Sequence, residues 1–126
     1  MAKKFATAIN CIDGRVQAPV IDFIRNNYDV YYVDMITTPG PDKLLSEYKD
    51  THEIKSIKKK VWISYKKHDS ELIFLVGHYD CAGNSCSEES HLQQIRKAMQ
   101  NIKEWKTNSE FYGLWVDKKR KAFLIK

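Results

Sequence analysis

Two short stretches of the chain contain residues whose types can bind a metal ion. "CIDGR" contains Cys11, Asp13 and Arg15, and "GHYDC" contains His78 and Cys81. Two thiolates and one imidazole are a common ligand set for zinc, and three protein ligands leave a fourth tetrahedral position open, as in catalytic zinc sites. The two stretches therefore predict a catalytic zinc centre, provided that the fold brings them together.

Asp13 and Arg15 are candidates for chemistry beside that metal. In an extended segment, residues 11, 13 and 15 point the same way, so both side chains are expected next to the ion. The carboxylate would accept a hydrogen bond from water on the metal, and the guanidinium would hold the carboxylate by a charge-assisted pair. An ion pair that only fixes the loop is the alternative for these two residues.

The two stretches can share one ion only if neighbouring strands carry them. The apolar run over residues 5–13 is typical of a central strand, and the non-alternating run 71–78 is typical of a strand covered on both faces. Between them the sequence predicts a helix with apolar positions from Val16 to Ile24, a strand over 29–35, a loop over 37–42, a short helix around Leu44 to Tyr48, and a longer helix capped by Thr51.

The rest of the chain completes an alternation of strands and helices. Ser87 followed by two glutamates predicts a helix start, with a buried stripe of Leu92, Ile95, Met99 and Ile102. Strands are expected over 110–117 and 122–126. This alternation predicts an α/β fold with a mostly parallel sheet flanked by helices, strand order 2-1-3-4 and a terminal edge strand.

This strand order predicts where the candidate residues meet. Ligands of such sheets bind beyond the carboxyl ends of the strands, where the strand order reverses. The first and third strands would be neighbours about 4.8 Å apart. Cys11 and His78, which end these strands, are therefore expected to approach each other.

Length and composition are those of one cytoplasmic domain. A chain of 126 residues with 43% hydrophobic content can bury one core, so residues 1–126 are expected to form a single domain. No run approaches the roughly 20 apolar residues that cross a bilayer, and "MAKKFATAINCIDG" becomes polar too soon for a secretion signal. A reducing compartment would keep the three cysteines as thiols.

The net charge of +5 is concentrated in the runs "KSIKKKVWISYKK" and "DKKRK". Such runs are usually solvated surfaces, and no RNA- or DNA-binding motif accompanies them. We therefore expect no nucleic-acid partner.

The combination C-x-D-x-R, followed about 60 residues later by H-x-x-C, resembles the β-class carbonic anhydrases. The similarity extends over about residues 5–105, and "GHYDC" matches the family's G-H-T-x-C with Tyr79 in place of threonine. The resemblance implies that family's fold, Zn²⁺ as cofactor, the metal ligands Cys11, His78 and Cys81, and the catalytic residues Asp13 and Arg15.

The activity that the resemblance implies is the reversible hydration of carbon dioxide to bicarbonate, a lyase reaction on small molecules. Zinc lowers the pKa of bound water from 15.7 toward about 7 and so supplies hydroxide at neutral pH. Asp13 would orient this hydroxide and Arg15 would orient Asp13. Backbone N–H groups around Gly83 would hold the developing oxyanion.

Two segments depart from the family pattern. Family members carry an N-terminal helical arm around a partner subunit, whereas here a strand is expected from residue 5, so we expect a homodimer without that clasp. They also carry R-N-A-G after the second strand, where this chain reads "VDMITTPGPDKLL". The altered pocket segment leaves two alternatives: a carbonyl sulfide or carbon disulfide hydrolase on the same fold, or a non-catalytic zinc-binding or redox-sensing protein.

A second zinc geometry is also open on the sequence alone. His78, Cys81, Cys86 and His91 lie in one segment, and local His/Cys clusters form structural sites. This cluster would leave Cys11 without a role. In the first geometry Cys86 is an ordinary thiol, although a disulfide with Cys81 under oxidation would remove a ligand from the metal.

Overall fold

A five-stranded sheet organises the computed structural model, which describes residues 4–125. Its elements are β1 (Phe5–Asn10), the 3-10 helix η1 (Gly14–Val16), α1 (Gln17–Asn27), β2 (Tyr32–Thr37), α2 (Pro41–Glu47), α3 (Thr51–Lys67), β3 (Leu72–His78), α4 (Glu88–Lys103), β4 (Glu110–Val116) and β5 (Ala122–Ile125). The strand order is β2-β1-β3-β4-β5, with β5 antiparallel to β4 and the other pairs parallel. The predicted fold class and strand order are confirmed.

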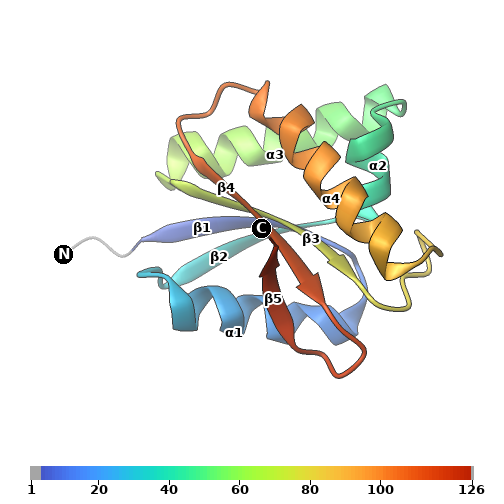
Figure 1. Ribbon diagram of the computed structural model, residues 1–126. Helices are drawn as coiled ribbons and strands as arrows, with labels where there is room; N and C mark the ends of the chain where they lie inside the picture. The colour runs from blue at the N-terminus through green and yellow to red at the C-terminus, as the bar shows by residue number, and fades with distance from the viewer. Residues whose placement is uncertain (1–3, 126) are drawn as a thin grey trace.

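Helices cover both faces of this sheet, as Figure 1 shows, with α1 on one side and α2, α3 and α4 on the other. The first crossover leads from β1 outward to β2, and the next returns past β1 to β3. The strand order therefore reverses between β1 and β3. The carboxyl ends of these two parallel strands form the place where such folds bind ligands.

The core consists of two apolar layers, one on each face of the sheet, because successive residues of a strand point to opposite faces. Along β3, Phe74 and Val76 pack on the α1 side, whereas Ile73 and Leu75 pack under α2, α3 and α4. β3 is buried on both faces, as its non-alternating apolar run predicted. Cys11 and Cys81 belong to the α1 layer.

Several element boundaries differ from the sequence prediction. β1 ends at Asn10 rather than at residue 13, because the following residues turn into η1. β2 begins at Tyr32 rather than at residue 29, since its parallel register pairs Tyr32 with Phe5, the first residue of β1. α2 begins at Pro41, inside the predicted loop, because proline at the first helical position needs no N–H partner.

Two details of the other helices were also predicted wrongly. Asp50, not Thr51, caps α3, and its side chain accepts a hydrogen bond from the N–H of Glu53. Ser87 caps α4 as predicted. The buried stripe of α4 consists of His91, Ile95, Ala98 and Ile102, while Leu92 and Met99 are half-buried. Lys126, part of the predicted last strand, lies outside the described residues.

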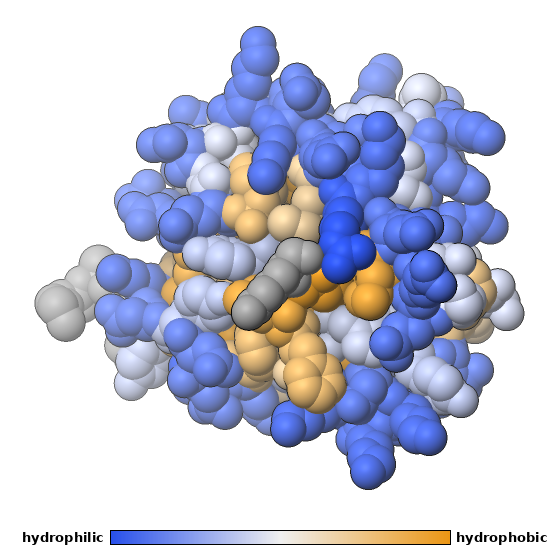
Figure 2. Space-filling view, viewed as in Figure 1, coloured by the Kyte–Doolittle hydropathy of each residue, from blue (hydrophilic) through white to orange (hydrophobic). Residues whose placement is uncertain are grey.

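The face seen in Figure 2 is hydrophilic around its edge, with apolar surface gathered at the middle, where β5 lies in Figure 1. Phe123 and Leu124 of β5 each keep 42% of their surface exposed. Within residues 4–125, none of the helices is both long and apolar enough to span a membrane.

Gly77, the residue before His78, has no room for a side chain. A Cβ there would lie 2.7 Å from Asp42 Oδ2 and 2.8 Å from Ile95 Cδ1. We expect Gly77→Ala to lower the free energy of unfolding by about 1–3 kcal/mol, the usual cost of overpacking, as measured by urea denaturation. Gly14→Ala is the control, because its Cβ would meet nothing within 4 Å. Equal stability of the two variants would contradict this expectation.

Candidate metal centre

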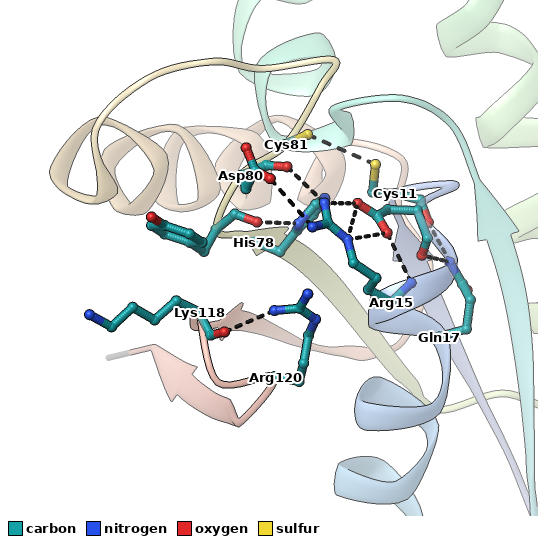
Figure 3. A network of polar contacts seen from close by, with 10 residues as sticks. Cys11, Arg15, Gln17, His78, Asp80, Cys81, Lys118 and Arg120 are labelled. Atoms are coloured by element: carbon teal, nitrogen blue, oxygen red, sulfur yellow. Dashed lines mark hydrogen bonds and ion pairs between the residues drawn. The ribbon is translucent and has the colours of Figure 1, made fainter.

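Three side chains with metal-binding atoms meet where β1 and β3 end. Cys11 directly follows β1, His78 is the last residue of β3, and Cys81 lies in the turn after it. The sulfurs of Cys11 and Cys81 are 3.8 Å apart, and the ligand atoms of the three residues lie within 4.8 Å of one another. All three residues are buried, and Figure 3 shows the two sulfurs facing each other. The structure thus brings together the three residues expected to bind metal.

A backbone carbonyl fixes the orientation of the His78 ring. Nδ1 lies 2.8 Å from the carbonyl oxygen of Tyr79, and because a carbonyl only accepts, Nδ1 carries the proton. Nε2 is then the nitrogen with a free lone pair. It is buried without a hydrogen-bond partner. A buried polar atom without a partner costs free energy unless a bound ligand supplies the missing interaction. A histidine held in this way has the tautomer that binds metal through Nε2.

The two sulfurs cannot both carry a charge at this distance without a cation. The hydrogen bond between the two sulfurs lowers the pKa of Cys11, against the opposing effect of burial. The same hydrogen bond and burial raise the pKa of Cys81 well above its ordinary value. A divalent ion between the sulfurs would compensate both thiolates, so this donor set fits zinc.

Asp13 and Arg15 lie together beside the candidate ligand Cys11. Arg15 donates two hydrogen bonds to the Asp13 carboxylate, from Nη2 to Oδ2 at 2.6 Å and from Nε to Oδ1 at 3.0 Å. The guanidinium holds the pKa of Asp13 far below its usual range, so the carboxylate is ionised. The expected extended path is wrong here. Residues 14–16 form η1, and Asp13 Oδ1 accepts a hydrogen bond from the backbone N–H of Arg15.

Arg15 also connects the two loops that carry the candidate ligands Cys11 and Cys81, a contact that the sequence did not predict. Its Nη2 donates to the carbonyl oxygen of Asp80 at 3.1 Å, and its Nη1 lies 3.3 Å from Asp80 Oδ2 (Figure 3). Asp80 directly precedes the ligand Cys81. Gln17 secures the first loop, because its Nε2 donates to the carbonyl oxygens of Cys11 and Asp13.

Gly40 and Gly83 contribute backbone donors to the sulfurs, beside the Asp13 backbone that also donates to Cys11, and the sequence did not predict these contacts. The N–H of Gly40 donates to Cys11, and the N–H of Gly83 donates to Cys81; each bond lowers the pKa of its cysteine. We expect backbone N–H groups around Gly83 to hold an oxyanion; the N–H of Gly83 itself is directed to the Cys81 sulfur. The glycine in "TTPGPD" indicates a backbone turn, and Gly40 does adopt a positive φ of +56°. The sequence does not indicate which atom its N–H contacts.

A cavity of about 340 Å³ borders the ligand Cys81. Its lining includes Asp80, Asn84, His91 and Trp115. Small molecules therefore have space on this side of the candidate metal centre.

The alternative local zinc cluster does not assemble. Among residues 4–125, Cys11, His78 and Cys81 form the one group of three or more side chains whose ligand atoms converge for a metal. His91 is buried, and its Nδ1 lies 2.6 Å from Asp42 Oδ2. Cys86 is an exposed thiol.

An α/β fold with a mostly parallel sheet, and a Cys, His and Cys candidate ligand set at the strand-order reversal, indicate a protein of the β-carbonic anhydrase class. Over residues 1–126 the chain matches the family described as "Putative carbonic anhydrase", and it therefore belongs to the β-carbonic anhydrase family. A search of curated protein sequences found no match.

Several solved structures are similar in fold. β-Carbonic anhydrase isoform I from Trichomonas vaginalis superposes with a TM-score of 0.65 at 17% identity, covering 98% of this chain and 84% of that one. Carbonic anhydrase from Glaciozyma antarctica gives 0.58 at 12% identity, covering 95% and 81%. The enzyme from Streptococcus mutans gives 0.57 at 13%, covering 98% and 83%. At these identities the similarity shows the fold alone.

Proposed function

We propose that this protein is a zinc-dependent carbonic anhydrase that hydrates carbon dioxide reversibly to bicarbonate. The observation that carries the proposal is the buried His78 ring. Its Nε2 has no hydrogen-bond partner, and the ring offers a ligand atom within 4.8 Å of both cysteine sulfurs. Cys11, His78 and Cys81 would hold the ion, and a tetrahedral zinc keeps one position open for chemistry. Membership of the carbonic anhydrase family supports this reaction.

Zinc, when bound, supplies Lewis acidity that makes hydroxide available near neutral pH. Asp13 would orient the attacking oxygen, because its ionised carboxylate is a hydrogen-bond acceptor beside Cys11. Arg15 would keep that carboxylate in place and discourage it from binding the metal, since both carboxylate oxygens already accept from the guanidinium. The link from Arg15 to Asp80 would hold the two ligand loops at a fixed separation.

Stopped-flow CO₂ hydration by zinc-loaded protein tests this function. A rate well above that of the same concentration of free zinc is expected. A rate equal to free zinc would favour the non-catalytic zinc-binding or redox-sensing protein. Rapid sulfide release from carbonyl sulfide or carbon disulfide, without CO₂ hydration, would favour the hydrolase.

The quaternary structure that we propose is a homodimer of single-domain chains in the cytoplasm. Exposed Phe123 and Leu124 on the edge strand β5 support association with a second copy. Three free cysteines support a reducing compartment. Size-exclusion chromatography with light scattering should give about twice the 14.8 kDa chain mass, and a monomer would contradict the dimer.

A further inference from the structure

A buried polar cluster lies near the candidate metal centre and contains none of its candidate ligands. It joins Asp42 in the first turn of α2, Asn84 in the loop after β3, and His91 in α4. Asp42 and His91 each expose 1% of their surface and Asn84 exposes 4%. The cluster therefore connects three segments that are distant in the sequence.

Short hydrogen bonds connect the polar groups of this cluster. The His91 Nδ1 donates to Asp42 Oδ2 at 2.6 Å, and the Asn84 amide donates to Asp42 Oδ1 at 2.9 Å and to Gln94 Oε1 at 2.6 Å. The N–H of Lys43 also donates to Asp42 Oδ1 at 2.9 Å. A buried polar pair of this kind is weak evidence for stability, and in some proteins such pairs specify geometry instead.

The cluster lies directly next to the two glycines that contact the ligand sulfurs. Asp42 follows Gly40 by two residues, and Asn84 follows Gly83 directly. The two glycine backbones touch: a Cβ on Gly40 would lie 2.7 Å from the carbonyl oxygen of Gly83, and a Cβ on Gly83 would lie 2.8 Å from the nitrogen of Gly40. The Asp42 to Asn84 hydrogen bond thus closes the contact between the two loops.

We propose that Asp42, Asn84 and His91 are positioning residues. They hold the N–H groups of Gly40 and Gly83 against the sulfurs of Cys11 and Cys81, and so set the affinity of the site for a divalent cation that prefers sulfur. Each N–H places a positive dipole end on a thiolate, and the cluster keeps both donors in place before the metal arrives. The inference rests on the proposed zinc site.

The first test measures zinc affinity by competition with a chromophoric chelator. We expect His91→Gln and Asn84→Ala to weaken zinc binding by about 10–100-fold, the usual effect of losing groups that orient metal ligands. His68→Gln is the matched control, because His68 pairs with Asp34 at the same 2.6 Å yet belongs to a different cluster. Circular dichroism checks that each variant is folded. Affinities for both variants within twofold of wild type would overturn the inference.

The second test measures a spectroscopic property of the cysteine thiolates. In Co²⁺-substituted protein, losing N–H donors makes the sulfurs more electron-rich, so the sulfur-to-cobalt charge-transfer band of His91→Gln should move to longer wavelength. Loss of stability alone would not move this band. An unchanged band would contradict the proposed positioning role.

Amide hydrogen exchange tests the cluster without any metal. In His91→Gln the amides of Gly40 and Gly83 should exchange at least tenfold faster, while those at the centres of β1 and β3 keep their rates. If wild-type protein binds no zinc, the proposed function fails and the exchange rates still decide the role of the cluster. If Cys11→Ser loses zinc but Asn84→Ala and His91→Gln keep it, the positioning role fails and the proposed function stands.

Discussion

Cys11→Ser and Cys81→Ser are expected to purify with most of their zinc missing, whereas wild-type protein should contain about one zinc per chain. Serine cannot supply the thiolate that zinc prefers, and each substitution leaves only one sulfur beside His78. Metal analysis by inductively coupled plasma mass spectrometry measures the content directly. The proteins should be purified without added chelator.

Cys86→Ser is the matched control for these variants. Cys86 is exposed and lies outside the candidate ligand set, and the serine hydroxyl can still donate to Asn84, so the zinc content should stay unchanged. Zinc loss from Cys86→Ser equal to that from Cys11→Ser would indicate the local cluster and contradict the ligand set. If Cys11→Ser keeps its full zinc content, this would also contradict the ligand set.

Asp13→Asn should keep its zinc and lower the rate of CO₂ hydration by about 10–100-fold, a typical cost of losing a group that orients metal-bound chemistry. Asparagine keeps an oxygen that can accept from the N–H of Arg15, so the turn should survive. It loses the negative charge and presents an amide to the guanidinium. Stopped-flow kinetics with metal analysis on the same sample separates turnover from metal loss.

Asp22→Asn controls for the loss of one carboxylate, because Asp22 is exposed on α1, outside the metal centre. Its rate should match wild type. If Asp13→Asn also turns over at the wild-type rate, Asp13 and Arg15 have no part in the reaction and form a loop-fixing ion pair.

The fold was largely predictable because hydrophobic periodicity identifies elements and their alternation restricts topology. The buried run ending at His78 and the small apolar run ending near Cys11 indicated two central strands, and the order β2-β1-β3-β4-β5 followed. The boundaries were less predictable, because they depend on pairing. Tyr32 starts β2 since its partner Phe5 starts β1, a long-range fact that local sequence does not contain.

The candidate site was predictable where side chains carry the chemistry and unpredictable where the backbone does. Cysteine and histidine at strand ends indicated metal binding, and the structure brings those three residues together. The N–H donors of Gly40 and Gly83 left no residue-type signal for their target. His91 had a weak signal, since a histidine in the same stripe as Ile95 and Ile102 must find a buried partner.

The segment "TTPGPD" departs from the family's R-N-A-G pattern, and the changed substrate pocket that this suggests stays a prediction. In the structure, Gly40 turns the backbone so that an N–H faces Cys11, and Asp42 connects the start of α2 to His91. The segment therefore packs against the candidate metal centre.

An anomalous-difference map from a crystal of zinc-loaded protein, collected at the zinc absorption edge, tests the central claim most directly. The account predicts one strong peak bonded to both sulfurs at about 2.3 Å and to the His78 Nε2 at about 2.0–2.1 Å. A peak bonded to Cys86 and His91, or none near Cys11 in fully loaded protein, would contradict it.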